Sequence, residues 1–237
     1  MNNKIIMDEE KIEKNLKKKN ILMAIGVVFL GLAVAGGTYA WLTNTLNVAN
    51  GVYNVGTTCF SIDYNIANAG SGQDITGTLF PGSGPIKGLT GRVGLRLNPS
   101  CSITGTGTLK LHINSGTSTK YGTVGAAHCE NTNTLETLND YTTSSACSGH
   151  GTWTSSSTVL KYAVYNNATA TGNPLSKGYI TTSDIGTDKI IYDNIAITSS
   201  TMTYYYIFIW LDGYLTDDTY VDLPFTGYIS ASAVQTH

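Results

Sequence analysis

Residues 41–237 consist of short runs of β-branched and aromatic residues, which are separated by Gly, Pro, Asn and Asp. Apolar residues at alternate positions in such runs are typical of half-buried β-strands, and the sequence of this part lacks the 3.6-residue period of a long amphipathic helix. Only 13% of the chain is charged, against about 25% in an average soluble domain, and Thr, Ser, Asn, Gly and Tyr take the place of the missing charges. The expected fold class is therefore all-β.

Turn residues mark the borders of nine expected strands. Asn50-Gly51 and Asp212-Gly213 favour two-residue hairpins, whereas the proline-containing segments 81–85 and 98–100 stop a continuing strand. The expected strands are 42–49, 52–64, 75–80, 92–97, 107–113, 159–165, 189–197, 202–211 and 225–234. A length of 197 residues from position 41 to the end suits one antiparallel β-sandwich domain.

An uncharged apolar run occupies residues 21–40, directly after three lysines at 17–19. The positive flank predicts that the N-terminus stays in the cytoplasm. A helix with a rise of about 1.5 Å per residue could just span a bilayer of about 30 Å, so a retained signal anchor is one interpretation. The short apolar centre and the small residues at its end favour the other, a signal peptide cleaved between Ala40 and Trp41. Both place the rest of the chain outside the membrane.

The charges are unevenly distributed along the chain. Residues 1–20 hold six lysines and four acidic residues, which leaves eight basic and twelve acidic residues for the remainder. A mildly acidic body does not attract phosphate groups. No nucleic-acid partner is expected, and the membrane is a partner only during export.

Four cysteines are present, namely Cys59, Cys101, Cys129 and Cys147. An even number in an exported chain favours two disulfides. Proximity in sequence pairs Cys59 with Cys101 and Cys129 with Cys147, although the other two pairings stay open. The second bridge would staple residues 115–157, a polar insertion with few large apolar side chains that is not expected to anchor itself by burial.

A zinc site is the alternative use of the second cysteine pair, with His128 and His150 as the other ligands. His128 and Cys129 are adjacent and cannot easily point at one ion, so the disulfide is preferred and no metal is expected. Two further histidines, His112 and His237, have no evident partner in the sequence.

The most apolar predicted strand covers residues 204–210. Ile207 and Ile209 should lie on one face, and Tyr206, Phe208 and Trp210 on the other. We expect a loop or the second sheet to cover the aromatic face, and a neighbouring subunit is the alternative.

Sequence patterns of catalysis are missing: the H-E-x-x-H helix, the G-x-S-x-G elbow, the P-loop and the dinucleotide fingerprint do not occur. We therefore expect no enzyme and no cofactor. Four acidic residues after the aromatic strand lack the spacing of a calcium loop, and a solvated hairpin is the preferred interpretation for Asp212, Asp217, Asp218 and Asp222. Residues 223–227 match the L-P-x-T-G sorting motif, but no apolar span or basic tail follows, so they should lead into a last strand.

The segment Gly36-Gly37-Thr38-Tyr39-Ala40-Trp41-Leu42-Thr43-Asn44 resembles the signal junction of the TasA and camelysin family, fibre proteins of the Gram-positive biofilm matrix. Leu79-Phe80-Pro81-Gly82 is similar to a second motif of that family. The resemblance implies a jelly-roll sandwich and a dedicated signal peptidase. It also implies fibres in which each subunit donates its mature N-terminal strand to the next.

The donated strand would begin at Trp41 and present Leu42, Leu46 and Val48 on one face. The alternative is that Asn50-Gly51 folds this segment back as a hairpin within its own subunit. The expected function is a secreted bacterial surface or matrix protein, located extracellularly or at the cell surface, whose main partner is a copy of itself. A secreted or membrane-tethered β-sandwich that binds a glycan or a protein is the alternative.

Overall fold

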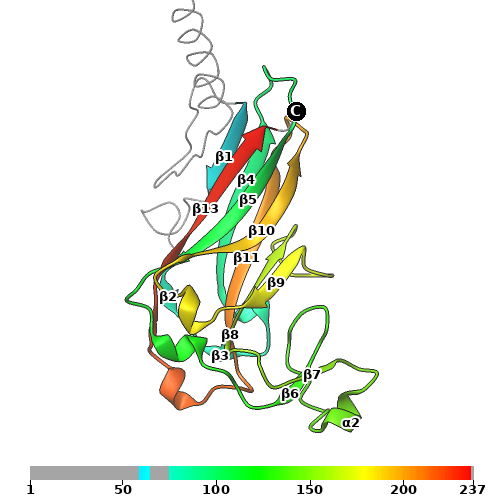
Figure 1. The fold of residues 1–237 in the computed structure, drawn as a ribbon, viewed down its shortest axis with the longest axis vertical. Coiled ribbons are helices and arrows are strands. Elements are labelled where there is room, and N and C mark those ends of the chain that lie inside the picture. Colours follow the sequence, from blue (N-terminus) through cyan, green and yellow to red (C-terminus); the bar gives the residue numbers. More distant parts are fainter. Residues whose placement is uncertain (1–58, 65–74, 236–237) are drawn as a thin grey trace, which may run out of the picture. The chain divides into compact units, whose positions relative to one another are not determined.

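A computed structural model of the chain describes residues 59–64 and 75–235. The chain divides into two compact units, Met1–Asn44 and Thr45–His237, and every described residue belongs to the second unit. Strands, nearly all of them antiparallel, are the main regular structure of these residues and the helices are short, which confirms the all-β class (Figure 1). The expected N-terminal hydrophobic helix and the first expected strand, 42–49, lie outside the described residues. Within the described ranges no helix is long and apolar enough to cross a membrane.

The first sheet has the strand order β1-β4-β11-β8-β9, and all neighbours on this path are antiparallel. Its strands are β1 (Phe60–Tyr64), β4 (Leu89–Leu97), β11 (Thr203–Asp212), β8 (Leu160–Tyr165) and β9 (Ser176–Tyr179). A two-residue strand, β3 (Pro81–Gly82), pairs in parallel with the end of β11.

The second sheet has the order β10-β5-β13 and is also antiparallel. Its strands are β10 (Asp188–Ile197), β5 (Gly105–Ile113) and β13 (Gly227–Gln235). Two small ribbons complete the strands: β12 (Pro224–Phe225) with β2 (Gly77–Thr78), and β6 (His128–Glu130) with β7 (Thr152–Thr154). The short helices are η1 (Pro85–Lys87), η2 (Thr119–Gly122), α2 (Ser144–Cys147), η3 (Thr182–Asp184) and η4 (Asp218–Tyr220).

The core lies between the two sheets. On β5, Leu109, Leu111 and Ile113 are fully buried and alternate with partly exposed residues. They belong to one cluster of buried side chains with Ile207 and Ile209 of β11. Full burial of such a side chain stabilises the fold by about 1.5–3 kcal/mol. Because the period-two pattern puts these side chains on one face of each sheet, the two sheets bury them by packing face to face.

The outer face of the first sheet carries a second apolar cluster. Phe208 and Trp210 of β11 pack there with Tyr165 of β8, and Leu135 of the insertion lies against them. Tyr165 and Phe208 meet edge to face, with ring centroids 5.7 Å apart. Both expectations for the aromatic strand are confirmed: the isoleucines face the core, and a loop of the same chain covers the aromatic side.

The insertion, residues 115–157, anchors itself by burial, contrary to expectation. Tyr121 is fully buried, and its hydroxyl donates a hydrogen bond of 2.5 Å to the carbonyl of Leu223. His128 and Glu130 are each 2% exposed. The expectation was wrong because it counted apolar side chains only, whereas this segment buries polar groups that find partners in the sheet.

Two disulfides join Cys59 to Cys101 and Cys129 to Cys147, the pairs that proximity predicts. The first links the residue before β1 to the connection between β4 and β5. The second links β6 to α2 inside the insertion. Bridges of this kind are typical of oxidising compartments.

Replacing Cys129 and Cys147 with serine is expected to lower the free energy of unfolding by about 3 kcal/mol, because the bridge closes a loop in the unfolded chain. Urea unfolding without reductant measures the effect. Removal of the Cys59–Cys101 bridge should cost slightly more, because its partners are 42 rather than 18 positions apart. A loss below about 1 kcal/mol for both pairs would contradict this account.

Several local expectations differ from the structure. Asp212-Gly213 does not form a two-residue hairpin: β11 ends at Asp212, and a loop containing η4 follows before β12. The expected strand at 75–80 is reduced to β2, and the short strands β3, β6, β7 and β9 were not expected. The segment 223–227 does lead into the last strand, since Phe225 is fully buried and β13 begins at Gly227.

Candidate functional site

A lysine is completely buried on the outer side of the first sheet. The Nζ atom of Lys161 donates to Glu130 Oε1 at 2.6 Å, to Asp212 Oδ2 at 2.5 Å and to the carbonyl of Leu135 at 2.8 Å. All three ammonium protons therefore have an acceptor, which a buried lysine requires. We call Lys161, Glu130, Asp212, His128 and Tyr179 the Lys161 cluster.

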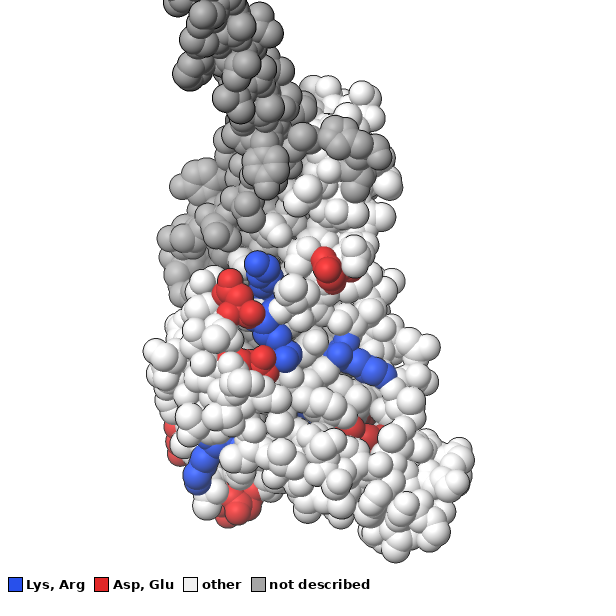
Figure 2. Space-filling view, in the orientation of Figure 1, with Lys and Arg blue, Asp and Glu red and all other residues white. Residues whose placement is uncertain are grey.

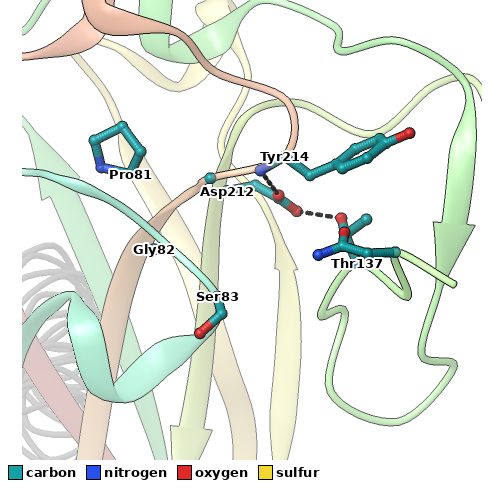
Figure 3. A pocket seen from close by; sticks show the side chains of 8 residues that line it. Pro81, Gly82, Ser83, Thr137, Asp212 and Tyr214 are labelled. Carbon is teal, nitrogen blue, oxygen red and sulfur yellow. Dashed lines mark hydrogen bonds between the residues drawn. The ribbon is translucent and has the colours of Figure 1, made fainter.

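Two neighbouring strands of the first sheet, β8 and β11, carry Lys161 and Asp212. Lys161 lies opposite Trp210 in the register of β8 and β11, and Asp212 follows at the end of β11. Asp212 Oδ1 accepts a hydrogen bond of 2.9 Å from the amide of Tyr214, and Oδ2 accepts one of 2.6 Å from the Thr137 hydroxyl (Figure 3). The Asp212 carboxylate is thus held from both sides.

Glu130 comes from the insertion, where the β6–β7 ribbon carries it. Its Oε1 atom lies 2.8 Å from His128 Nε2, and its Oε2 atom accepts a hydrogen bond of 2.5 Å from the Tyr179 hydroxyl. The other ring nitrogen of His128 lies 2.7 Å from the carbonyl of Ala126. Both ring nitrogens of His128 thus lie within hydrogen-bonding distance of an oxygen atom. The cluster thus brings the Lys161 ammonium together with two carboxylates.

The electrostatics of Glu130 follow from these contacts. Burial alone would raise the pKa of its carboxyl, but the hydrogen bond from His128 and the charge and hydrogen bond of Lys161 outweigh burial. They lower the pKa of Glu130 from 4.5 to about 2. Burial and the neighbouring Glu130 raise the pKa of the Tyr179 hydroxyl, which therefore remains a donor.

The lowered pKa of Glu130 predicts acid sensitivity. A carboxyl whose pKa is depressed on folding stabilises the protein above its unfolded pKa, and this contribution is lost as the pH falls through the folded pKa. The stability difference between the wild type and Glu130→Gln should shrink by about 3 kcal/mol from about pH 5 to about pH 2. Urea unfolding of both proteins at stepped pH measures it. A difference that stays constant over this range would contradict the assignment.

Leu135 adopts an unusual backbone conformation at this site. Its φ angle is +62°, in the left-handed region that bulky side chains rarely occupy. This conformation lets one residue serve two contacts, because the side chain packs on the aromatic cluster while the carbonyl accepts from Lys161. The contacts must offset a backbone strain of about 1–3 kcal/mol.

A pocket of about 330 Å³ opens beside Asp212 (Figure 3). We call it the Asp212 pocket. It is lined by Pro81, Gly82, Ser83, Thr137, Asn139, Asp212, Gly213 and Tyr214. Tyr214 is 48% exposed, whereas Asp212 is 3% exposed, so the Asp212 carboxylate lies between the pocket and the buried lysine.

The cluster contains a set of possible metal ligands, because atoms of His128, Glu130 and Asp212 lie within 4.8 Å of one another. The ammonium of Lys161 bonds to both carboxylates, so the positive charge between them is supplied by the protein itself. The alternative zinc site, with Cys129 and Cys147 among its ligands, is not compatible with this structure, since the sulfurs of the two cysteines are bonded to each other.

The other residues singled out in the sequence lie in different places. His150 stacks on Tyr141 with centroids 4.2 Å apart. His112 does have partners, contrary to expectation: its Nδ1 lies 2.7 Å from Asp188, and its ring stacks on Tyr228. The solvated hairpin was wrong for Asp212, which is buried, while Asp217 accepts a hydrogen bond from the amide of Thr219 at the start of η4.

The residues expected to mark cleavage and strand donation are Ala40, Trp41, Leu42, Leu46 and Val48, which lie outside the described residues, as does His237. Lys161 and Glu130 were missed. A signal for Lys161 existed, because it is the only charged residue of the apolar stretch 159–165. A lone charge in a buried strand needs a buried partner.

Comparison of the chain with models of known families, with curated proteins and with solved structures found no match. The similarity to TasA and camelysin therefore rests on the two sequence motifs alone. No site residue is transferred to this chain from a relative.

Proposed function

We propose that this protein is an exported structural subunit of a bacterial cell surface or extracellular matrix, which joins copies of itself into fibres by strand donation and is not an enzyme. The observation that carries the proposal is the outer edge of β13. Main-chain groups at this edge point away from the second sheet. The hydrogen bond between Ala231 of β13 and Tyr64 of β1 shows that the edge lies beside β1, the edge strand of the first sheet (Figure 1).

Two hydrogen bonds define which groups point outward. The carbonyl of Gly227 accepts from the amide of Ile75 at 2.7 Å, and the amide of Ala231 donates to the Tyr64 hydroxyl at 3.0 Å. Alternate residues of an antiparallel strand direct their main-chain groups to the same side. The main-chain N–H and C=O groups of Ile229 and Ala233 therefore also point away from β5. Beyond Gly227, no strand of residues 59–64 and 75–235 pairs with this edge. A donated strand could bind there.

The finer fold we propose is a jelly roll. Its support is the order β4-β11-β8-β9 in one sheet and β10-β5-β13 in the other. The chain changes sheet five times, between β4 and β5, β5 and β8, β9 and β10, β10 and β11, and β11 and β13. Such crossings are typical of interlocked Greek keys.

Export is supported by the two disulfides, and the surface charge is consistent with a structural role. Figure 2 shows a mostly uncharged face on which basic and acidic groups lie side by side. A large positive patch of the kind that binds nucleic acid is not seen on the described part of this face.

The test of strand donation uses two complementary variants. Deleting residues 41–49 removes the proposed donor, and Ala233→Pro removes an outward-facing amide of the proposed acceptor edge without touching the pairing with β5. Each variant alone should form no fibres by negative-stain microscopy, while its circular dichroism stays that of the wild type. Mixed together they should form a heterodimer, because one intact donor meets one intact edge.

Fibres made by the protein lacking residues 41–49 would contradict strand donation. The N-terminal residue of the exported protein is a separate check, and mass spectrometry should find Trp41 if the signal peptide is removed. An intact N-terminus in the membrane fraction would favour a tethered protein.

A binding module is the second candidate, and the Asp212 pocket favours it. Its lining combines the half-exposed ring of Tyr214 with the side chains of Ser83 and Asn139. An aromatic ring beside hydroxyl and amide groups suits a sugar or a peptide. Trp153, a second aromatic residue of the insertion, lies half-buried on β7 opposite Cys129. Glycan-array binding lost in Tyr214→Ala would support this candidate.

A further inference from the structure

An amine and a carboxyl group are held in position to react within the Lys161 cluster. Lys161 Nζ lies 2.5 Å from Asp212 Oδ2. A carbon–oxygen bond of about 1.2 Å then places Nζ at most about 3.7 Å from the carboxyl carbon of Asp212. Reacting atoms in near-attack geometry are about 3–3.5 Å apart. The nitrogen and the carbon are therefore within a few tenths of an ångström of that geometry.

We propose that Lys161 and Asp212 condense into an intramolecular amide, which covalently links β8 to the end of β11, with Glu130 as the proton carrier. The bond that forms joins Nζ to the Asp212 carboxyl carbon. The bond that breaks joins this carbon to one carboxyl oxygen, which leaves as water.

The step balances without any other reactant. Glu130, at 2.6 Å from Nζ, takes one proton from the ammonium, and the neutral amine attacks the carboxyl carbon. Glu130 then returns this proton to the departing oxygen, and a second proton from the nitrogen completes the water molecule. An ammonium and a carboxylate thus become one amide and one water, with no change in total charge and no oxidation or reduction.

The surroundings stabilise the developing charge. The tetrahedral intermediate places negative charge on the Asp212 oxygens, which already accept hydrogen bonds from the Tyr214 amide and the Thr137 hydroxyl. Donors fixed in this way before the reaction are the usual source of catalysis in acyl transfer. The Asp212 pocket borders the same carboxylate and gives the released water a route to solvent.

Burial also favours the amide over the ion pair. Lys161 is fully buried and Asp212 nearly so, and an ion pair in such a place carries a large desolvation cost that a neutral amide avoids. After condensation the Glu130 carboxylate keeps two hydrogen-bond partners, His128 Nε2 at 2.8 Å and the Tyr179 hydroxyl at 2.5 Å. Because the fold holds the amine beside the carboxyl group, the reaction is intramolecular. Well-oriented intramolecular reactions proceed as if one reactant were present at about 10⁵ M or more.

Tryptic mapping of the purified full chain tests the proposal. The protein is denatured and reduced before digestion, so that only the amide can hold the strands together. An acylated Lys161 is not cleaved by trypsin, and its peptide, residues 121–177, should stay joined to residues 190–237, with a mass lower than their sum by one water molecule. Separate peptides ending at Lys161, with no linked species, would overturn the proposal even if every variant failed to fold.

Three variants assign the roles. Asp212→Ala should give cleavage at Lys161, because the acyl group is gone. Glu130→Gln should reduce the linked fraction at least tenfold, and full linkage in this variant would overturn the proton-carrier role. Lys177→Gln is the matched control, since Lys177 also comes from the region near Glu130 but bonds to the carbonyl of Thr132. It should leave the linkage complete, with the linked peptide extended to residue 189.

Discussion

Replacing Lys161 with methionine is expected to lower the free energy of unfolding by about 3–5 kcal/mol at neutral pH. Methionine fills a similar volume but carries no charge, so Glu130 and Asp212 would face each other as buried carboxylates. The Lys161 side chain, as an ammonium or in the proposed amide, prevents this repulsion, and buried charges left without compensation cost more than the net contribution of an ion pair. Guanidinium unfolding followed by tryptophan fluorescence measures the change.

Lys110→Met is the matched control for this variant. Lys110 lies on β5 between Leu109 and Leu111 and is only half-buried, and its substitution should change stability by less than about 0.5 kcal/mol. The penalty of Lys161→Met should also shrink in acid, because a proton on one carboxyl group relieves the repulsion. Equal effects of the two substitutions would rule out a specific role for the buried Lys161 side chain.

Replacing Trp210 with alanine is expected to cost about 3–5 kcal/mol, because the side chain is 1% exposed and fills the space between the first sheet and the insertion. The cavity would also remove the surface on which Leu135 packs. Limited proteolysis should therefore cut residues 115–157 sooner in this variant than in the wild type.

The control for Trp210→Ala is Ile190→Ala. Ile190 is 54% exposed on β10, so its truncation should change stability by about 0.5 kcal/mol or less and leave the cleavage pattern unchanged. If Trp210→Ala destabilised the protein but left the insertion as resistant as before, the insertion would not depend on the aromatic cluster.

Period-two patterns predicted strands such as β5 and β10, because each has one face that must be buried, whereas β11 was predicted from an apolar run whose two faces are both buried. The expected strand 107–113 appears as Gly105–Ile113, and 189–197 appears as Asp188–Ile197, each within two residues. The opposite faces of Ile207 and Trp210 were predicted because successive side chains of a strand point to opposite sides of the sheet. Short strands such as β6 and β9 were not predicted, since three or four residues are too few to show a period. These strands form because neighbouring strands supply hydrogen-bond partners.

The site was harder to predict than the fold. Glu130, Lys161 and Asp212 are far apart in the sequence, and only the β8–β11 register and the folding of the insertion bring them together. A lone lysine in an apolar strand indicates that a buried partner exists, but not which acid it is. The disulfide of the insertion was found from spacing, because its partners are close along the chain.

The Cys59–Cys101 disulfide determines how the sandwich responds to mechanical load. Cys59 directly precedes β1, and Cys101 follows β4, the strand with which β1 pairs. Tension that arrives along the preceding polypeptide passes through the sulfur–sulfur bond to the β4–β5 connection and bypasses the β1–β4 ladder. The first strand therefore cannot be peeled off by pulling, and rupture must begin deeper in the domain.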